Sequence, residues 1–355
     1  MWRDNLEQDF DRQFELNAPS VPLTHSVRRK GFGLTIRLVG LAPREALLSA
    51  RGFKVATPQA RQALEAAGAA FIRGYNQALQ VRDVLAATGE AVSPVGRAWR
   101  GFFMEGAAMG FAVRDAMPWH LLASSRLPLF LGSVSASNPY LPTVGAGWAM
   151  ARLPWRRTAI LSSLDRLLAP LALDGWGFHD CYFNPNKFFR GPSRQVERLT
   201  GDPGARSWDQ GAGRALWFIS GGCIAEACAL IARVAPSRHA DLFAGLGLAI
   251  TYAGGIGAEA TKRLRSTAGP FRRDLAQGSA FALEAHVRAL TDTPAVIERA
   301  ESLIGIDAAS AITIVRSAMP IKVGELGKAS NESWELYERW RTRVANELEI
   351  LDEVA

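Results

Sequence analysis

The sequence predicts an all-α protein: a curved, solenoid-like array of helix pairs, with a repeat near 35 residues, that encloses an apolar groove or cavity. Three observations support this fold class. Glycine-led apolar segments recur along the chain, amphipathic segments lie between them, and β-branched alternation is nearly absent. With 48% apolar and 21% charged residues among 355, the chain can bury a large core. This composition excludes collagen-like, coiled-coil and disordered chains.

Seven short segments, each opening on a glycine, define the predicted repeat. The leading glycines are Gly68, Gly106, Gly145, Gly175, Gly211, Gly245 and Gly278. The steps between them are 38, 39, 30, 36, 34 and 33 residues, which suits a unit of two helices and two turns. Glycine inside a helix costs about 1 kcal/mol relative to alanine, so its recurrence needs a cause. Close helix–helix packing is one interpretation, and a concave surface left open for a ligand is the other.

The predicted elements follow one another in three parts. Residues 1–50 form an N-terminal helical or irregular extension, and residues 51–325 form the helical-repeat domain. Within this domain, the segments 224–234, 258–268 and 294–304 are amphipathic and are followed by proline or glycine, which is typical of surface helices.

The third part, residues 326–355, is predicted to be an amphipathic helix packed on the same domain. Its large apolar residues recur every three or four positions, at Trp334, Tyr337, Trp340, Val344, Leu348 and Leu351. Its remaining positions are rich in acids, as expected for the solvent-facing side of a helix.

The net charge of +7, from 41 basic and 34 acidic residues, permits an anionic partner without requiring one. The most basic segment is 262–273, KRLRSTAGPFRR. It has two interpretations, a phosphate- or nucleic-acid-binding patch and a solvated loop. The turn signal at Gly269-Pro270 favours the loop, so we expect no nucleic-acid partner.

The compartment follows from features that the sequence lacks. Its three cysteines have no C-x-x-C spacing, which predicts neither disulfides nor a thiol-rich zinc site. The N-terminus carries acids instead of the apolar stretch of a secretory signal, and no uncharged window suits a transmembrane helix. The sequence therefore predicts a cytoplasmic protein. Peripheral membrane attachment through residues 28–30 and 31–41 is the alternative, and the oligomeric state is open.

Polar and aromatic residues gather beside the leading glycines, most densely in 174–183, DGWGFHDCYF. The candidate catalytic residues are Glu105, Asp174, His179, Asp180 and Asp209. The candidate substrate-binding residues are Trp176, Phe178, Tyr182, Arg214, Trp217, Tyr252 and Gln277. A carboxyl group of Glu105, Asp174 or Asp209 that reaches His179 across the groove would form an acid–base pair. Tyr252 is either a hydroxyl facing the groove or a core aromatic.

Other candidates also have a structural interpretation. Asp174 and Asp209 each precede a glycine-rich turn of helix, where an aspartate can serve as an N-cap. His179 can be a satisfied, half-buried histidine. Arg214 either binds a carboxylate or phosphate of the substrate, or forms a structural bridge to Asp209 or Glu105.

Several familiar motifs are missing. The sequence has no phosphate-binding loop, no serine-hydrolase elbow, no H-E-x-x-H zinc motif and no EF-hand loop. It also lacks the Asp-rich cluster of prenyl-diphosphate enzymes and the D-x-D-D of protonation-initiated cyclases. We expect no metal site and no cofactor.

Taken together, the glycine-led motifs resemble those of a known family. They are RGF at 51–53 and the longer segments 100–111, 144–154, 173–183, 209–218, 245–255 and 275–289. They resemble a bacterial family of unknown function found beside enediyne polyketide synthase genes. The resemblance runs from about residue 50 to 290 and continues weakly to the C-terminus. It implies a role in maturing a linear, highly unsaturated polyketide into a cyclic enediyne-type core, or in handling that intermediate, and it assigns no catalytic residue.

We therefore predict a natural-product biosynthesis enzyme that cyclises or isomerises a linear polyene, polyketide or isoprenoid, by acid–base chemistry in an aromatic-lined helical cavity. One carboxyl group would donate the proton, and His179 would act as the base. The alternative is a non-catalytic protein, either a carrier for a hydrophobic intermediate or a scaffold for synthase partners.

Overall fold

The computed structural model describes residues 37–81, 83–84, 96–118, 125–321, 323 and 329–354. Over these residues the elements are helices, with no strand among them, which confirms the all-α prediction. Much of the predicted N-terminal extension, including residues 28–30, and the predicted boundary at residue 325 lie outside the described residues.

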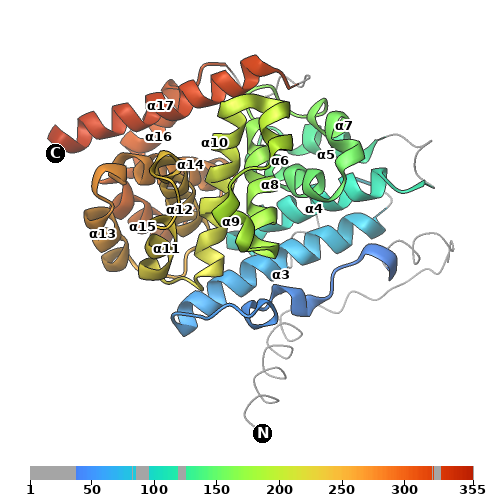
Figure 1. The fold of residues 1–355 in the computed structure, drawn as a ribbon, viewed down its shortest axis with the longest axis horizontal. Helices are drawn as coiled ribbons and strands as arrows, with labels where there is room; N and C mark the ends of the chain where they lie inside the picture. Colours follow the sequence, from blue (N-terminus) through green and yellow to red (C-terminus); the bar gives the residue numbers. More distant parts are fainter. Residues whose placement is uncertain are drawn as a thin grey trace, which may run out of the picture.

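The core is built from helices that pack in chain order, each against the next (Figure 1). We call them the central helices: α3 (Pro58–Gln80), α4 (Arg100–Asp115), α6 (Tyr140–Arg152), α8 (Pro170–Phe183), α10 (Arg194–Ile219), α12 (His239–Ala253) and α14 (Arg272–Arg288). Local signals set several of their ends. Thr57 caps α3 by accepting from the Ala60 N–H at 3.0 Å, and α10 is kinked at Gly201, where φ is +64°.

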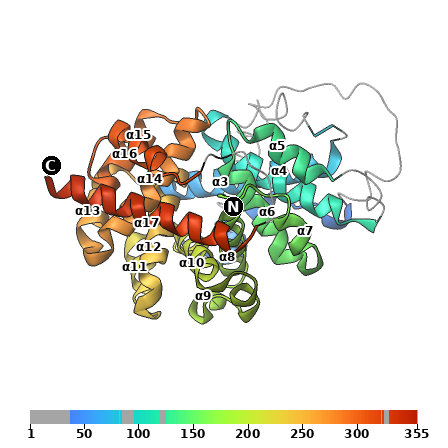
Figure 2. The ribbon, with the colours of Figure 1, turned by 90° about the horizontal axis from the view of Figure 1, so that it is seen from above.

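Shorter helices follow the central ones: α5 (Arg126–Val134), α7 (Arg157–Leu161), α9 (Asn186–Arg190), α11 (Ile224–Ile231), α13 (Ala258–Thr267), α15 (Pro294–Ile304) and α16 (Ala308–Ser317). Single 3₁₀ turns precede α4, α7, α12 and α14, and η1 (Pro43–Ala46) and η2 (Leu48–Arg51) precede α3. The last helix, α17 (Asn331–Val354), lies across the others (Figure 2). The predicted segments 224–234, 258–268 and 294–304 correspond to α11, α13 and α15.

The leading glycines lie where adjacent central helices touch through their backbones. At five of the seven leading glycines, a Cβ atom would overlap the carbonyl oxygen of the residue just before the leading glycine of the preceding helix. The pairs are Gly145 with Glu105, Gly175 with Val144, Gly211 with Asp174, Gly245 with Gln210 and Gly278 with Ala244. At Gly106 a Cβ atom would overlap the Phe71 carbonyl oxygen, and at Gly68 it would lie 3.3 Å from Ala46. Close helix packing therefore accounts for these glycines. The solenoid-like repeat remains a prediction.

The succession of central helices bends back on itself. Helix α12 packs against α10 and α14, and it also contacts α3. Its Tyr252 hydroxyl abuts Gly101 of α4 so closely that a Cβ atom at residue 101 would overlap the hydroxyl oxygen. The faces of α4, α6, α8, α10, α12 and α14 that point inward are thus brought around one interior.

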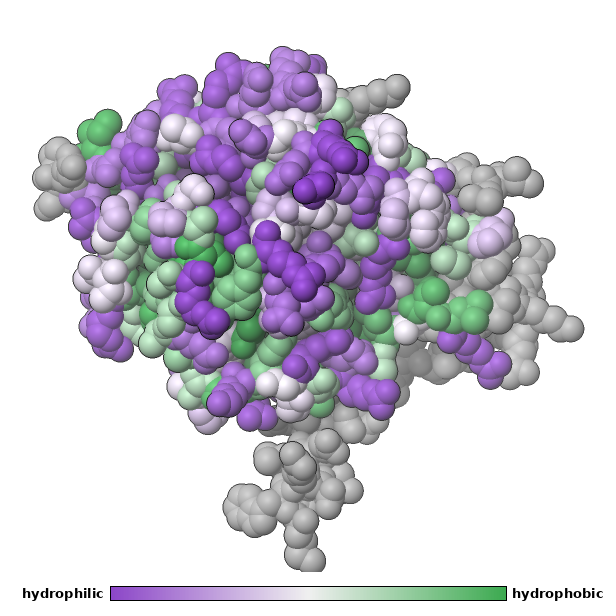
Figure 3. Space-filling view, in the orientation of Figure 1, coloured by the Kyte–Doolittle hydropathy of each residue, from purple (hydrophilic) through white to green (hydrophobic). Residues whose placement is uncertain are grey.

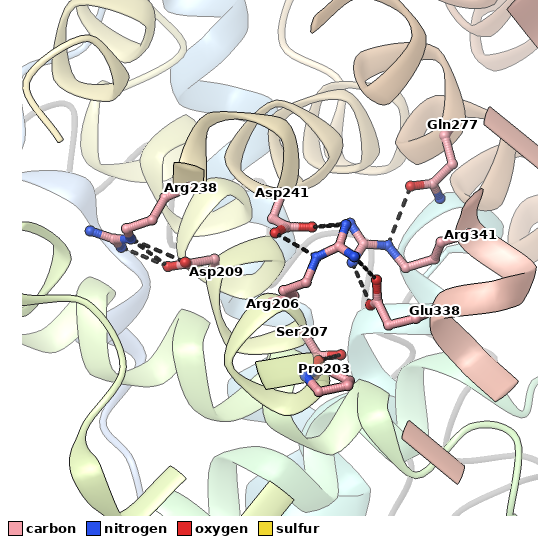
Figure 4. A network of polar contacts seen from close by, with 9 residues as sticks. All are labelled: Pro203, Arg206, Ser207, Asp209, Arg238, Asp241, Gln277, Glu338 and Arg341. Atoms are coloured by element: carbon pink, nitrogen blue, oxygen red, sulfur yellow. Dashed lines mark hydrogen bonds and ion pairs between the residues drawn. The ribbon is translucent and has the colours of Figure 1, made fainter. Parts of the chain in front are cut away.

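Charged side chains attach α17 to the central helices. Figure 4 shows Arg341 of α17 beside Asp241 and Glu338, to which it donates hydrogen bonds of 2.8 Å each. Arg206 of α10 pairs with the same two carboxylates at 3.1 and 2.7 Å. On the face seen in Figure 3, the edge occupied by α17 in Figure 1 is largely hydrophilic. The opposite side of α17 buries Tyr337 and Trp340.

The basic segment 262–273 is helical over most of its length, so its prediction as a solvated loop is wrong. It contains the end of α13, a turn at Gly269–Phe271 and the start of α14. Arg265 pairs with Asp352 of α17, and Arg273 lies 3.4 Å from Glu349 of the same helix. The acidic side of α17 therefore balances part of the charge of this segment.

Candidate functional site

Two small chambers lie in the interior of the central helices, and Arg214 lines both. Chamber A has a volume of about 60 Å³ and is lined by Leu41, Glu45, Arg51, Leu64, Ala67, Gly68, Phe71, Ile72, Phe102, Glu105, Trp148, Phe178, Tyr182, Phe183, Arg214 and Phe218. Chamber B has a volume of about 40 Å³ and is lined by Tyr140, Leu141, Val144, Leu171, Asp174, Arg214, Leu248, Tyr252, Phe281, Ala282, Glu284, Ala285, Val315, Tyr337 and Trp340. Both linings are mostly apolar.

A buried polar cluster separates the two chambers. The Arg214 guanidinium pairs with Asp174 through Nη1, and its Nη2 lies 3.8 Å from Oε1 of Glu105. The Trp148 indole donates a hydrogen bond of 3.0 Å to that same Glu105 oxygen, and Gln210 donates one of 2.7 Å to Asp174. All five side chains are buried. We call these residues the polar cluster.

The polar cluster contains one carboxyl group whose pKa is close to neutral pH. The pKa of Glu105 is raised to about 7: burial is the largest cause and the nearby Asp174 carboxylate adds to it, whereas Arg214 and the Trp148 N–H oppose the rise. Burial alone would lower the pKa of Arg214, but Asp174 and Glu105 outweigh it and raise that pKa instead. The cluster thus holds a fixed guanidinium–carboxylate pair beside a carboxyl group able to exchange its proton near pH 7.

Aromatic rings form one wall of chamber A. Trp148 lies with its ring centre 4.5 Å from that of Phe71 and 5.1 Å from that of Phe178, and Tyr182 stacks on Phe178 at 5.6 Å. The Arg214 guanidinium lies 5.2 Å from the centre of the Phe178 ring. A ligand in chamber A would therefore contact both aromatic π faces and the Glu105 carboxyl group.

The structure brings six of the predicted site residues together. Glu105, Asp174 and Arg214 belong to the polar cluster, and Phe178, Tyr182 and Tyr252 line the chambers. The bridge from Arg214 to Glu105 is present, together with a pair to Asp174 that the sequence did not indicate.

The other polar candidates have partners elsewhere. His179 accepts a hydrogen bond of 3.2 Å from Arg152, and its Nδ1 lies 3.7 Å from Asp180. Asp180 in turn accepts from Lys187 at 2.7 Å, and Asp209 forms a bidentate pair with Arg238. The predicted pairing of His179 with Glu105, Asp174 or Asp209 is therefore wrong.

Three further candidates also lie away from the described linings of both chambers. Trp176 stacks under Arg157 at 3.9 Å, Trp217 donates to the Gly254 carbonyl at 2.9 Å, and Gln277 accepts from Arg341 at 3.4 Å. The N-cap interpretation of Asp174 and Asp209 is wrong as well, because both lie inside their helices, α8 and α10.

Sequence reasoning missed four lining residues that share one position. Phe71, Trp148, Leu248 and Phe281 each lie three residues after a leading glycine, as do Phe178 and Arg214. This constant offset was readable in the sequence. Tyr337 and Trp340 of α17 also line chamber B, and only the apolar spacing of the last helix pointed to them.

The described part of the chain contains neither a cluster suited to a metal ion nor a helix suited to span a membrane. No group of three or more His, Cys, Asp or Glu side chains there is arranged to hold a metal ion. None of the helices described has the length and apolar character needed to cross a bilayer.

Comparison with known proteins gives one match. A family model described as "Protein of unknown function (DUF1702)" matches residues 33–348. The curated proteins and the solved structures contain no significant match to the chain.

Proposed function

We propose that this chain, which belongs to the DUF1702 family of proteins of unknown function, is an enzyme that isomerises or cyclises a linear polyene by acid–base chemistry. One observation carries the proposal. The Glu105 carboxyl group, with a pKa raised to about 7, lines an aromatic-rich chamber beside the Arg214 guanidinium. A general acid works best when its pKa lies close to the working pH.

The reaction begins with transfer of the Glu105 proton to a carbon atom of the conjugated chain. The π electrons of the double bond at that carbon atom form the new C–H bond, and the rest of the conjugated chain becomes a delocalised carbocation. In a cyclisation, a remote double bond then attacks the cation and forms a C–C bond. Loss of a neighbouring C–H proton to the Glu105 carboxylate closes the cycle. The product is an isomer of the substrate, so no oxidant or reductant is needed.

The surroundings of Glu105 favour this sequence of charges. After the first transfer Glu105 is a carboxylate, and Arg214 and the Trp148 N–H stabilise it. The faces of Trp148, Phe178 and Phe71 stabilise the developing cation through their π electrons. Because the polar cluster is buried, water that would quench the cation is excluded.

The chambers must widen before such a substrate binds. Chamber A, at about 60 Å³, is smaller than a polyene. Its cover is formed by Leu41, Glu45 and Arg51, which belong to the short segment around η1 and η2 and not to a central helix. We expect this segment to move when the substrate enters, while the central helices stay in place.

The substrate class follows from the lining and from the family resemblance. The aromatic wall suits an extended conjugated chain. The glycine-led motifs resemble those found beside enediyne polyketide synthase genes, which favours a linear polyketide polyene, and an isoprenoid polyene is the second choice. The reaction would then form part of enediyne-type natural-product biosynthesis.

The test is deuterium transfer from the protein to a polyene. The chain is incubated in D₂O with a linear conjugated polyene, and the products are analysed by mass spectrometry. We expect an isomer one mass unit heavier than the substrate. Glu105→Gln lowers its rate of formation at least about a hundredfold. Glu65→Gln is the matched control, because Glu65 is also a buried glutamate with a raised pKa but lies outside both described linings.

Recovery of unlabelled, unchanged polyene from the wild-type chain would refute the enzymatic proposal. If that polyene had bound tightly, the result would support the carrier function instead. Equal rates for Glu105→Gln and the wild type would show that another group donates the proton.

A further inference from the structure

We propose that chamber B binds an uncharged, oxygen-bearing end of the same substrate whose conjugated portion is converted in chamber A. This inference rests on the proposed function and narrows its substrate class to polyenes with a neutral terminus, such as a ketone. It disfavours carboxylates and diphosphates.

The two chambers adjoin at the polar cluster. Arg214 lines both, and Glu105 faces chamber A while Asp174 faces chamber B. Tyr252 connects them from the side, because it lines chamber B and its ring meets Phe102 of chamber A edge to face at 5.2 Å. A linear molecule bound beside Glu105 would therefore extend past Arg214 into chamber B.

The charges around chamber B select a neutral terminus. Its lining includes two carboxyl groups, those of Asp174 and Glu284, and one guanidinium, that of Arg214. These charges are already paired, Asp174 with Arg214 and Glu284 with Arg288 at 3.2 Å and Arg316 at 2.9 Å. A charged end of either sign would lose its hydration without meeting an unpaired opposite charge, whereas an uncharged end avoids this penalty.

Two tyrosine hydroxyls supply donors for a neutral oxygen. Tyr252 is 5% exposed, and its hydroxyl has no hydrogen-bond partner among the described residues. Tyr140 is 8% exposed, and its hydroxyl lies beside Arg288 without a hydrogen bond of normal geometry there. Burial raises the pKa of both, so they remain O–H donors. Buried hydroxyls are rarely left unpaired in native proteins. A ligand oxygen that accepts from one of them would satisfy this requirement.

The rest of chamber B requires the ligand to be apolar around that oxygen. Leu141, Val144, Leu171 and Val315 provide aliphatic walls, and Tyr337 and Trp340 of α17 cover the chamber. A methyl ketone at the end of a polyene combines these properties, because it carries one accepting oxygen and an otherwise apolar terminus.

The test compares three probes that share one conjugated tetraene chain and end in a methyl ketone, a carboxylate or a hydrocarbon. Binding to the full chain is measured at pH 6.5 by quenching of tryptophan fluorescence, since Trp148 and Trp340 line the two chambers. We expect the ketone to bind at least about tenfold more tightly than the carboxylate. It should bind about two- to tenfold more tightly than the hydrocarbon, through one neutral hydrogen bond. Tyr252→Phe, Tyr140→Phe or both should remove this second advantage and leave hydrocarbon affinity unchanged.

A matched pair of variants locates the binding. Ala282→Leu fills chamber B, and Ala67→Leu fills chamber A, since each alanine lines one chamber and is almost fully buried. Both variants should weaken binding of the ketone. If only Ala67→Leu does so, chamber B is not used and this inference is wrong, while the proposed function stands.

Two further outcomes separate the proposals. Carboxylate binding as tight as ketone binding overturns the inference whatever the deuterium assay gives. If the wild type prefers the ketone and Ala282→Leu loses that preference, while no deuterium is transferred, the binding inference is supported and the enzymatic proposal is refuted. If Ala282→Leu does not fold, the inference is tested by Tyr252→Phe and Tyr140→Phe alone, through the loss of the ketone's advantage over the hydrocarbon.

Discussion

Replacing Glu105 with glutamine tests whether the interior holds this carboxyl group in its neutral form. The pKa of Glu105 is about 7 in the folded chain, against 4.5 for an unperturbed glutamate. A group with a raised folded pKa stabilises the fold fully below its unfolded pKa and loses that contribution as the pH rises through the folded value. Glutamine cannot ionise, so the variant lacks this dependence.

The magnitude follows from the two pKa values. Each unit of difference corresponds to about 1.4 kcal/mol, so Glu105 contributes about 3 kcal/mol at low pH, of which about 2–3 kcal/mol is lost between pH 5 and pH 8. Over this interval we expect the wild-type free energy of unfolding to fall by about 2–3 kcal/mol more than that of Glu105→Gln. Other titrating groups, such as Asp209, whose pKa burial raises to about 6, are present in both chains and cancel.

The assay is urea denaturation followed by tryptophan fluorescence at several pH values from 5 to 8. Glu335→Gln, which changes an exposed glutamate of α17, is the control and should follow the wild type. If the wild type and Glu105→Gln lose stability in parallel, Glu105 titrates like an exposed glutamate. Glu105 would then not be available as a proton donor near neutral pH.

Three further predictions use the same denaturation and deuterium assays. Gly177→Ala places a Cβ atom against a backbone carbonyl of α10 and should cost about 3 kcal/mol or more, whereas Gly132→Ala, with open space around it, should change stability by no more than about 1 kcal/mol. Asp241→Asn removes a carboxylate shared by two arginines (Figure 4) and should cost about 3 kcal/mol; no loss would mean that this network does not fasten α17. Trp148→Phe removes a hydrogen bond to ionised Glu105 and should raise the upper pH limit of deuterium transfer by about one unit; an unchanged limit would contradict this role.

Much of the secondary structure was predictable because its signals are local. The segment 294–304 coincides with α15, which starts at a threonine cap and a proline and ends at Gly305 with φ of +96°. The apolar spacing of the last segment likewise identified α17. The sequence did not indicate where α17 lies, because the contact of Arg341 with Asp241 joins residues 100 positions apart.

The site was predicted less completely, because neighbouring residues on a helix point in directions about 100° apart. Phe178 and His179 are adjacent in α8, yet Phe178 lines chamber A and His179 bonds with Arg152. Asp209 and Gln210 are separated in the same way, since Gln210 joins the polar cluster and Asp209 pairs with Arg238. The density of chemical groups along the sequence was therefore a poor guide to the site. The position three residues after a leading glycine is a better one, because it gives a chamber-lining residue in six of the seven segments.

The glycines and the polar cluster have a common cause. The backbone carbonyls of Glu105, Asp174 and Gln210 each touch the leading glycine of the next helix. These backbone contacts leave the three Cα atoms little room to move, so the side chains are attached to a rigid backbone. A buried carboxyl group can be held beside a guanidinium without reorganisation only on such a frame. In each segment, one residue precedes the leading glycine and another follows it by three positions. These two residues are four apart, so they share one helix face. The residues that make the backbone contacts and the residues that line the chambers therefore face the same interior.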